Sequence, residues 1–79
     1  MLIERIVSAG QTTEFGVWLE QERDEWVVVL EGEAELALAD GSTLRLGRGD
    51  HVLIATGERH RVESTSADPV CIWLAVHFP

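Results

Sequence analysis

The sequence predicts an all-β fold, a small barrel of short antiparallel strands with little or no helix. Turn signals recur about every 8–12 residues, which is the rhythm of an all-β sandwich or barrel. Seven glycines interrupt a chain of 79 residues. The segment 26–29 is aromatic or β-branched throughout, and such residues favour strands over helices.

Eight strands are expected, each lying between turn residues. In chain order they are Leu2–Val7, Glu14–Gln21, Glu25–Leu30, Glu33–Ala39, Thr43–Leu46, His51–Ile54, His60–Ser64 and Val70–Phe78. Ser8-Ala9-Gly10 ends the first strand, and Glu22-Arg23-Asp24 forms a polar turn after the second. Gly32 lets the chain bend between the third and the fourth.

The fourth strand is the one ambiguous element, because residues 31–40 are rich in Glu, Ala and Leu, which favour helix. Leu36 and Leu38 alternate with Ala37, and Asp40-Gly41 follows directly as a strong two-residue hairpin signal. These features favour a strand. The later turns are expected at residues 47–50, 56–58 and 65–69.

Both faces of the third strand are apolar. Successive strand residues point to opposite faces, so Glu25 shares a face with Val27 and Val29. The opposite row is also apolar and consists of Trp26, Val28 and Leu30. One small barrel cannot bury both rows in its own interior. We expect the outer row, together with Trp18, to be covered by a second copy of the chain in a homodimer.

Size and composition limit the class of protein. Seventy-nine residues suit one domain, spanning 1–79, and Cys71 is the only cysteine, so disulfides are excluded. The net charge of -8 argues against nucleic acid and anionic membranes as partners. No apolar run reaches the about 20 residues of a membrane span, and no signal peptide is evident, so a cytoplasmic location is expected.

Two spacings join a possible metal ligand to the glycines of a tight turn. The first is Glu25-x6-Gly32, and the second is Gly49-x5-Ala55-x-Gly57-x2-His60. Over residues 15–64 the chain resembles the two motifs of the cupin family, G-x5-H-x-H-x3/4-E-x6-G and G-x5-P-x-G-x2-H-x3-N. The resemblance is to small stand-alone cupin-2 type proteins, and it implies a single jelly-roll barrel.

The resemblance also implies a metal site. Glu25 stands at the family's glutamate position and His60 at its second-motif histidine. With a three-residue spacer, the two first-motif histidines fall on Leu19 and Gln21. Leu19 cannot coordinate a metal, whereas Gln21 can offer an amide oxygen. The second-motif proline and asparagine are replaced by Ala55 and Ser64.

Gln21, Glu25 and His60 would supply two oxygens and one nitrogen. Such a set suits one divalent ion, Mn²⁺, Fe²⁺, Ni²⁺ or Zn²⁺, with water in the open positions. Plainer interpretations stay open: Glu25 can bond a turn amide, Gln21 can be a hydrogen-bonding group at the barrel mouth, and His60 can be an exposed loop histidine.

Three other residues carry weaker signals. His77 shares a face with Cys71, Trp73 and Ala75, and the sequence does not decide whether that face is the interior or the outer layer. His51 follows a Gly-Asp turn and is expected to be structural or exposed. Cys71 is expected to be a small buried apolar residue.

Three functional hypotheses follow. The chain is a metal-dependent enzyme acting on a small organic molecule, a non-enzymatic module that binds or senses a small molecule in the barrel, or a purely structural dimeric domain. The absence of the two first-motif histidines counts against the metal-dependent enzyme. The sequence predicts a pocket and names no substrate.

Overall fold

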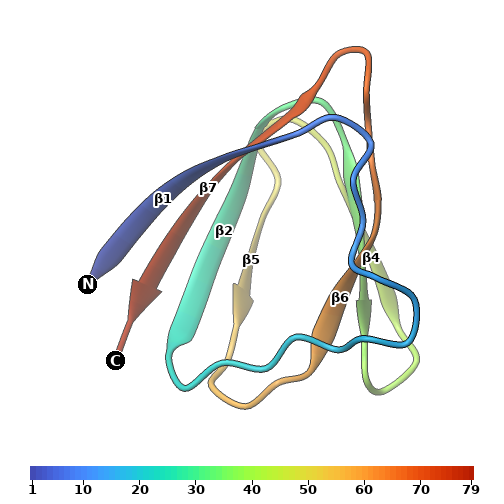
Figure 1. Cartoon of the computed structure of the whole chain (residues 1–79). Coiled ribbons are helices and arrows are strands. Elements are labelled where there is room, and N and C mark those ends of the chain that lie inside the picture. Colours follow the sequence, from blue (N-terminus) through green and yellow to red (C-terminus); the bar gives the residue numbers. More distant parts are fainter.

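The computed structural model describes all 79 residues and contains seven strands and no helix (Figure 1). The strands are β1 (Leu2–Ser8), β2 (Asp24–Glu31), β3 (Ala34–Leu38), β4 (Thr43–Leu46), β5 (His51–Ile54), β6 (His60–Thr65) and β7 (Cys71–Phe78). The predicted all-β fold class is therefore confirmed, and the ambiguous stretch forms strand β3. The chain has no helix long and apolar enough to cross a membrane.

The strands form two antiparallel sheets that face each other (Figure 1). One sheet has the order β1-β7-β2-β5 and the other the order β4-β3-β6. The chain changes sheet after β2, β4, β5 and β6. The first and last strands, β1 and β7, pair side by side in the four-stranded sheet. Two packed antiparallel sheets with such crossovers form a jelly roll.

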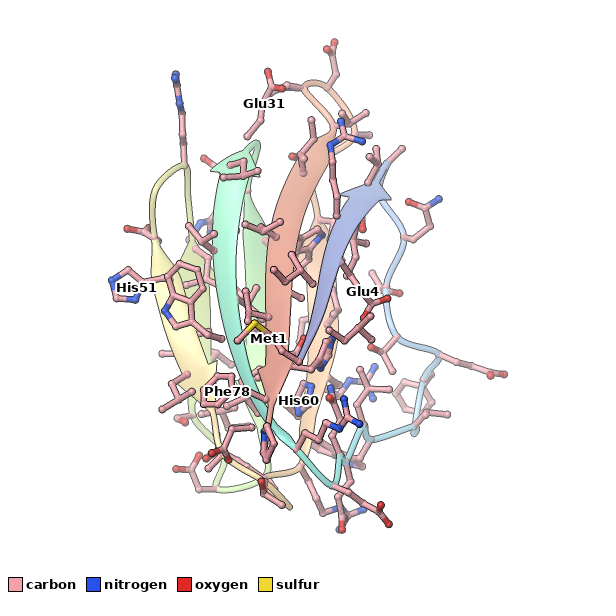
Figure 2. All side chains as sticks on the ribbon, turned by 90° about the vertical axis from the view of Figure 1, so that its left-hand side faces the viewer. Met1, Glu4, Glu31, His51, His60 and Phe78 are labelled. Carbon is pink, nitrogen blue, oxygen red and sulfur yellow. The ribbon has the colours of Figure 1, made fainter.

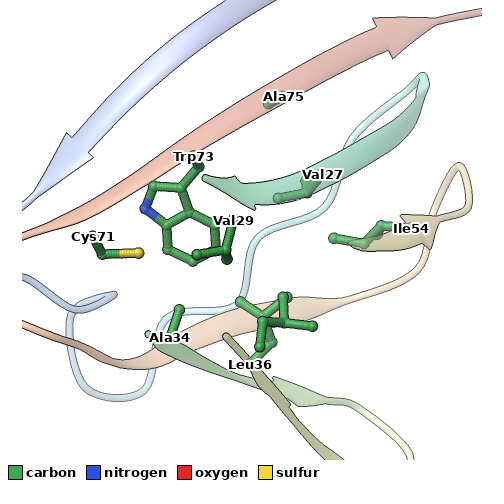
Figure 3. Packing of buried hydrophobic residues seen from close by; sticks show 9 residues of the cluster. Val27, Val29, Ala34, Leu36, Ile54, Cys71, Trp73 and Ala75 are labelled. Atoms are coloured by element: carbon green, nitrogen blue, oxygen red, sulfur yellow. The ribbon is translucent and has the colours of Figure 1, made fainter. Parts of the chain in front are cut away.

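Nine buried apolar side chains fill the space between the sheets (Figure 3). They are Val27, Val29, Ala34, Leu36, Leu46, Ile54, Cys71, Trp73 and Ala75. Those from β2 and β7 occupy alternate positions, because successive strand residues point to opposite faces. Cys71 is fully buried, as expected, and burial raises the pKa of its thiol. A thiol of that kind is a packing residue.

Residues 14–21 form a loop, so the prediction of a strand at Glu14–Gln21 is wrong. Only Leu19 makes an isolated bridge, to His60. Gly16 has a φ of 81°, which ends any extended run, and Phe15 is 95% exposed. The alternating apolar pattern is present, but the chain turns at Gly16, where the Val17 N–H donates to the Glu14 carbonyl, so the segment meets β6 only at Leu19.

Trp18 also departs from expectation. Its ring lies 5.9 Å from the guanidinium carbons of both Arg59 and Arg61. Because Arg61 belongs to β6, Trp18 packs beside the three-stranded sheet. It is not part of the outer row that contains Trp26.

The β2–β3 turn is pressed against the chain that leads into β7. Gly32 has a φ of 80°, a left-handed conformation that glycine adopts without strain. A Cβ at this position would lie 2.5 Å from both Ser66 Oγ and the Val70 carbonyl oxygen. The glycine of the first motif is therefore required by both conformation and space.

The start of β2 is tied to the loop between β5 and β6. Asp24 Oδ1 accepts hydrogen bonds from the backbone N–H and the hydroxyl of Thr56, both at 2.8 Å. The Gly57 N–H donates to the Gln21 carbonyl at 2.9 Å. The bonds from Thr56, first from its backbone and then from its side chain, lower the pKa of Asp24 below its ordinary 3.8. These contacts join the segments that carry the two motifs.

Gly32→Ala should reduce the free energy of unfolding by about 2 to 4 kcal/mol, combining left-handed strain with a backbone clash. Gly41→Ala is the matched control, since Gly41 has a φ of 92° and no atom within 4 Å of an added Cβ. It should lose only about 1 to 2 kcal/mol. Urea unfolding measures both, and equal losses would contradict the close approach at Gly32.

Asp24→Asn should be less stable than wild type at neutral pH. The carboxylate is held with a lowered pKa, so its contribution is complete above 3.8 and is lost as the pH falls through the folded-state pKa. The stability difference from wild type, measured by urea unfolding at a series of pH values, should therefore shrink on acidification. Glu22→Gln, in the neighbouring loop, is the control and should show little difference. A pH-independent difference at Asp24 would count against this role.

Candidate functional site

A carboxylate from one sheet meets an imidazole from the other. Glu25 lies near the start of β2 and pairs with Ile54 of β5 and His77 of β7. His60 begins β6 in the opposite sheet. The Glu25 Oε1 and His60 Nε2 atoms are 3.9 Å apart, and the two residues are only 8% and 4% exposed. The two spacings of the sequence thus converge on one buried pair.

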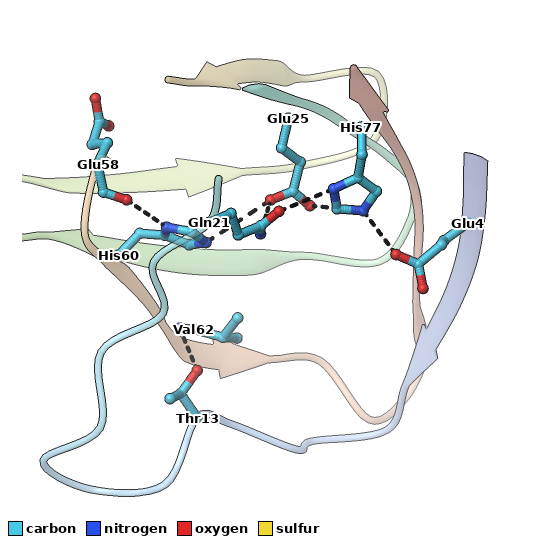
Figure 4. Close-up of polar contacts among 8 residues, drawn as sticks. All are labelled: Glu4, Thr13, Gln21, Glu25, Glu58, His60, Val62 and His77. Atoms are coloured by element: carbon cyan, nitrogen blue, oxygen red, sulfur yellow. Dashed lines mark hydrogen bonds and ion pairs between the residues drawn. The ribbon is translucent and has the colours of Figure 1, made fainter. Parts of the chain in front are cut away.

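His60 is held in a fixed orientation. Its backbone N–H and carbonyl both bond to Leu19, at 3.0 and 2.7 Å. Its ring Nδ1 lies 3.0 Å from the Glu58 carbonyl oxygen, an acceptor that requires Nδ1 to carry the proton. In the neutral ring the Nε2 lone pair is then free and is directed toward Glu25 (Figure 4).

Gln21 bridges the carboxylate to a second imidazole. Its amide nitrogen donates to Glu25 Oε1 at 2.7 Å, and its amide oxygen lies 3.0 Å from Nδ1 of His77. Gln21 thus lies between Glu25 and His77. Its oxygen faces His77 and its nitrogen faces the carboxylate (Figure 4).

His77 and Glu4 complete the site. His77 Nε2 is 2.7 Å from Glu4 Oε1 and 3.9 Å from Glu25 Oε2. Both ring nitrogens of His77 therefore face side-chain oxygens, one from Gln21 and one from Glu4. The alternation along β7 had left the facing of His77 open, and the structure places it inward. Glu4 was missed, because only the pairing of β1 with β7 brings it near.

These polar groups stand at the rim of an apolar cavity of about 260 Å³. Apolar side chains from both sheets form most of its wall, and Leu19 adds the loop that precedes β2. The apolar lining is Ile6, Leu19, Val27, Leu36, Ile54, Val62, Trp73 and Ala75. A concave apolar space with a few convergent polar groups is the usual form of a small-molecule site.

The other sequence candidates lie elsewhere. Leu19 contacts the cavity with an apolar side chain and has no donor for a metal. His51 lies on the far side of the sheet, with its ring centre 5.6 Å from that of Trp26. It is exposed, as expected, and does not approach the site.

The side chains of the site fit a metal ion only in part. His60 fits, because a backbone carbonyl holds Nδ1 and leaves Nε2 available, as in metal-bound imidazoles. Glu25 fits as a carboxylate beside it. No group of three or more His, Cys, Asp or Glu side chains is placed to hold a metal. The residues therefore fit only an open site of one carboxylate and one imidazole, to which Gln21 could add an oxygen if its amide turned.

Comparison with known proteins gives a consistent result. The model of the cupin domain matches residues 5–77. A solved structure, a putative mannose-6-phosphate isomerase from Ralstonia eutropha JMP134, is 38% identical with a TM-score of 0.90, covering 95% of this chain and 70% of that one. No curated protein matches this chain.

Two further solved structures are similar in fold. A protein of unknown function from Rhizobium leguminosarum bv. viciae 3841 is 23% identical with a TM-score of 0.78, covering 98% of this chain and 68% of that one. The DMSP lyase DddQ from Ruegeria pomeroyi DSS-3 is 23% identical with a TM-score of 0.76, over 98% of this chain and 36% of that one. The family match spans nearly the whole chain, and this chain belongs to the cupin family.

Proposed function

We propose that the cavity binds one small organic molecule that is uncharged or cationic, with its apolar body between the sheets and a hydrogen-bond-donating end at Glu25 and His60. One observation carries the proposal. The buried Glu25 carboxylate and the free Nε2 of His60 are acceptors directed toward each other at the rim of an apolar cavity. Buried acceptors of this kind favour a ligand that donates to them.

The charge of the lining supports this class of ligand. Glu4 and Glu25 both line the cavity, and the lining contains no Arg, while the chain contains no Lys. His77 is the only other group that could carry positive charge beside His60, and it is engaged with Glu4. A phosphate or carboxylate would meet acidic oxygens without a free cation, so the phosphorylated sugar in the name of the Ralstonia protein is a disfavoured ligand here.

The volume of the cavity limits the size of the ligand. Sites for drug-sized ligands have volumes of about 300 to 1,000 Å³. At about 260 Å³ this cavity lies just below that range, so we expect a small metabolite rather than a large cofactor. Trp73 and Leu36 face it from opposite sheets and provide apolar contact for the body of the ligand.

A metal-assisted enzyme is the second candidate, and the orientation of His60 favours it. Glu25 and His60 would hold a divalent ion, which would supply Lewis acidity toward an oxygen of the bound molecule. Without an ion, Glu25 and the Nε2 of His60 are two bases within reach of one small molecule, and one of them could take a proton from it and return that proton to a second atom of the same molecule. In either case Gln21 donates one hydrogen bond to Oε1 of Glu25, the oxygen that faces His60, and this bond fixes the orientation of the carboxylate.

Small amines and polyols, screened in chelator by thermal shift, should contain stabilising ligands, whereas matched carboxylic and phosphorylated compounds should not stabilise. At ten times the dissociation constant the gain is about 1.4 kcal/mol, or about 6 to 11 °C for a domain of this size. Glu25→Gln should abolish the shift. Glu20→Gln, at an exposed loop position, is the control and should retain it. Stabilisation by the anionic compounds alone would overturn the assignment of ligand class.

Wild-type protein prepared without chelator should retain more divalent metal than His60→Ala or Glu25→Gln if the metal-assisted candidate is correct. Elemental analysis measures the metal, and His51→Ala is the matched control because His51 lies outside the site. Retention is expected to be incomplete, since two strong donors form a weak site. Equal metal in wild type and the two site variants would remove this candidate and leave metal-free binding.

A further inference from the structure

The outward face of the four-stranded sheet is apolar, although a sheet that faces water usually carries polar residues on that side. Figure 2 looks onto this face, where β5, β2, β7 and β1 lie side by side. The register places Trp26 beside Val76 and Val28 beside Leu74 at its centre. Ile3 on β1 and Leu53 on β5 flank this centre and are 60% and 55% exposed. These six residues define the outer apolar face.

Charged and polar residues on this side lie at its margin. Arg5 is on the edge strand β1 and His51 on the opposite edge strand β5. Asp24 and Glu31 are the first and last residues of β2. Glu31 is labelled in Figure 2. An apolar centre with a polar rim is the usual anatomy of a protein–protein interface.

The distribution of charge narrows the choice of partner. The chain has a net charge of -8, so two copies repel each other over most of their surface. On this side of the four strands the acidic residues are limited to the ends of β2, because Glu4 and Glu25 point inward to the cavity. The rim carries both signs, Arg5 against Asp24 and Glu31, and can therefore complement the same rim on a second copy.

The size of the face sets the size of the contact. Strands β1, β2 and β7 have seven or eight residues and β5 has four. At about 4.8 Å between strands and about 3.3 Å per residue, they give a planar footprint of about 400 Å². The relief of the side chains raises the accessible area above this footprint, toward the about 800 Å² per partner that a standard interface buries. A flat face of one sheet can stack on its own copy at the spacing of packed sheets, about 10 Å.

We propose that the outer apolar face binds a second copy of this chain and forms a two-fold symmetric dimer. The same patch serves both partners, as a two-fold interface requires. Trp26 and its neighbours on β7 form the centre of the contact. The cavity lies on the opposite face of this sheet, so the dimer does not depend on what the cavity binds.

Sedimentation equilibrium over a range of concentrations tests the proposal. Wild type should have the mass of two chains at micromolar concentration. Leu53→Lys and Ile3→Lys each place a charge on the face at a position that is exposed in the single chain, so folding should persist. Each should raise the dimer dissociation constant about tenfold or more. Phe15→Lys is the matched control, at a residue 95% exposed in the loop before β2, and should leave the mass unchanged.

A single-chain mass for wild type at high micromolar concentration would overturn the proposal. A dimer that persists undiminished in both face variants would also overturn it, because the interface would then lie elsewhere. Tryptophan emission provides a check that needs no substitution on the face. In Trp18→Phe, changed at a residue outside the face, the remaining emission comes from Trp26 and from Trp73, which is buried in the core. On dilution of this variant below the dissociation constant the emission should shift to longer wavelength, and no shift accompanying dissociation would place Trp26 outside the contact.

Discussion

Glu25 is a carboxylate held 8% exposed at the edge of an apolar core. Burying such a charge without partners would cost several kcal/mol, so the surrounding chain must supply hydrogen bonds or opposite charge. One direct hydrogen bond comes from Gln21 in the loop before β2, at 2.7 Å, while His60 of β6 and His77 of β7 each lie 3.9 Å from the carboxylate. The surroundings of this one carboxylate therefore bring the loop, both sheets and the last strand together at the wall of the cavity.

The same alternation along the strands that points Glu25 inward points Trp26 outward. Val27 and Val29 then enter the core while Val28 lies on the outer face. A strand that is apolar on both faces needs apolar partners on each side. Within the single chain, the core between the sheets covers only the inward face of β2. The proposed dimer and the proposed ligand site thus arise from opposite faces of a single strand.

Spacing within a short stretch of sequence was informative wherever local geometry decides the structure. Asp40-Gly41 predicted the β3–β4 hairpin, and the glycine spacings predicted the turns that bring Glu25 and His60 together. The strand expected at Glu14–Gln21 failed because the chain turns at Gly16 and pairs with β6 only at Leu19. Apolar alternation alone does not reveal such a turn.

Glu4 and the facing of His77 could not be predicted for a related reason. Glu4 reaches the site through the pairing of β1 with β7, and His77 lies beside Glu25 through the pairing of β7 with β2. A register between segments so far apart leaves no mark in the spacing of either one. Ser8 shows the same dependence, since it accepts a hydrogen bond from the Trp73 ring nitrogen at 3.1 Å across the pair of β1 with β7. Side chains that meet through long-range pairing become visible only once the sheet order is known.

The replacement of the two first-motif histidines has a physical consequence beyond the loss of metal donors. Leu19 extends the apolar wall of the cavity, while Gln21 supplies one donor and one acceptor from a neutral group. That combination allows Gln21 to stand between a carboxylate and an imidazole and satisfy both at once. An imidazole at this position would bring a third ionisable ring next to His60 and His77. The neutral amide instead leaves Glu25 and His60 as the reactive pair, which is why a donating organic ligand, with or without a metal, is the occupant these residues are best suited to hold.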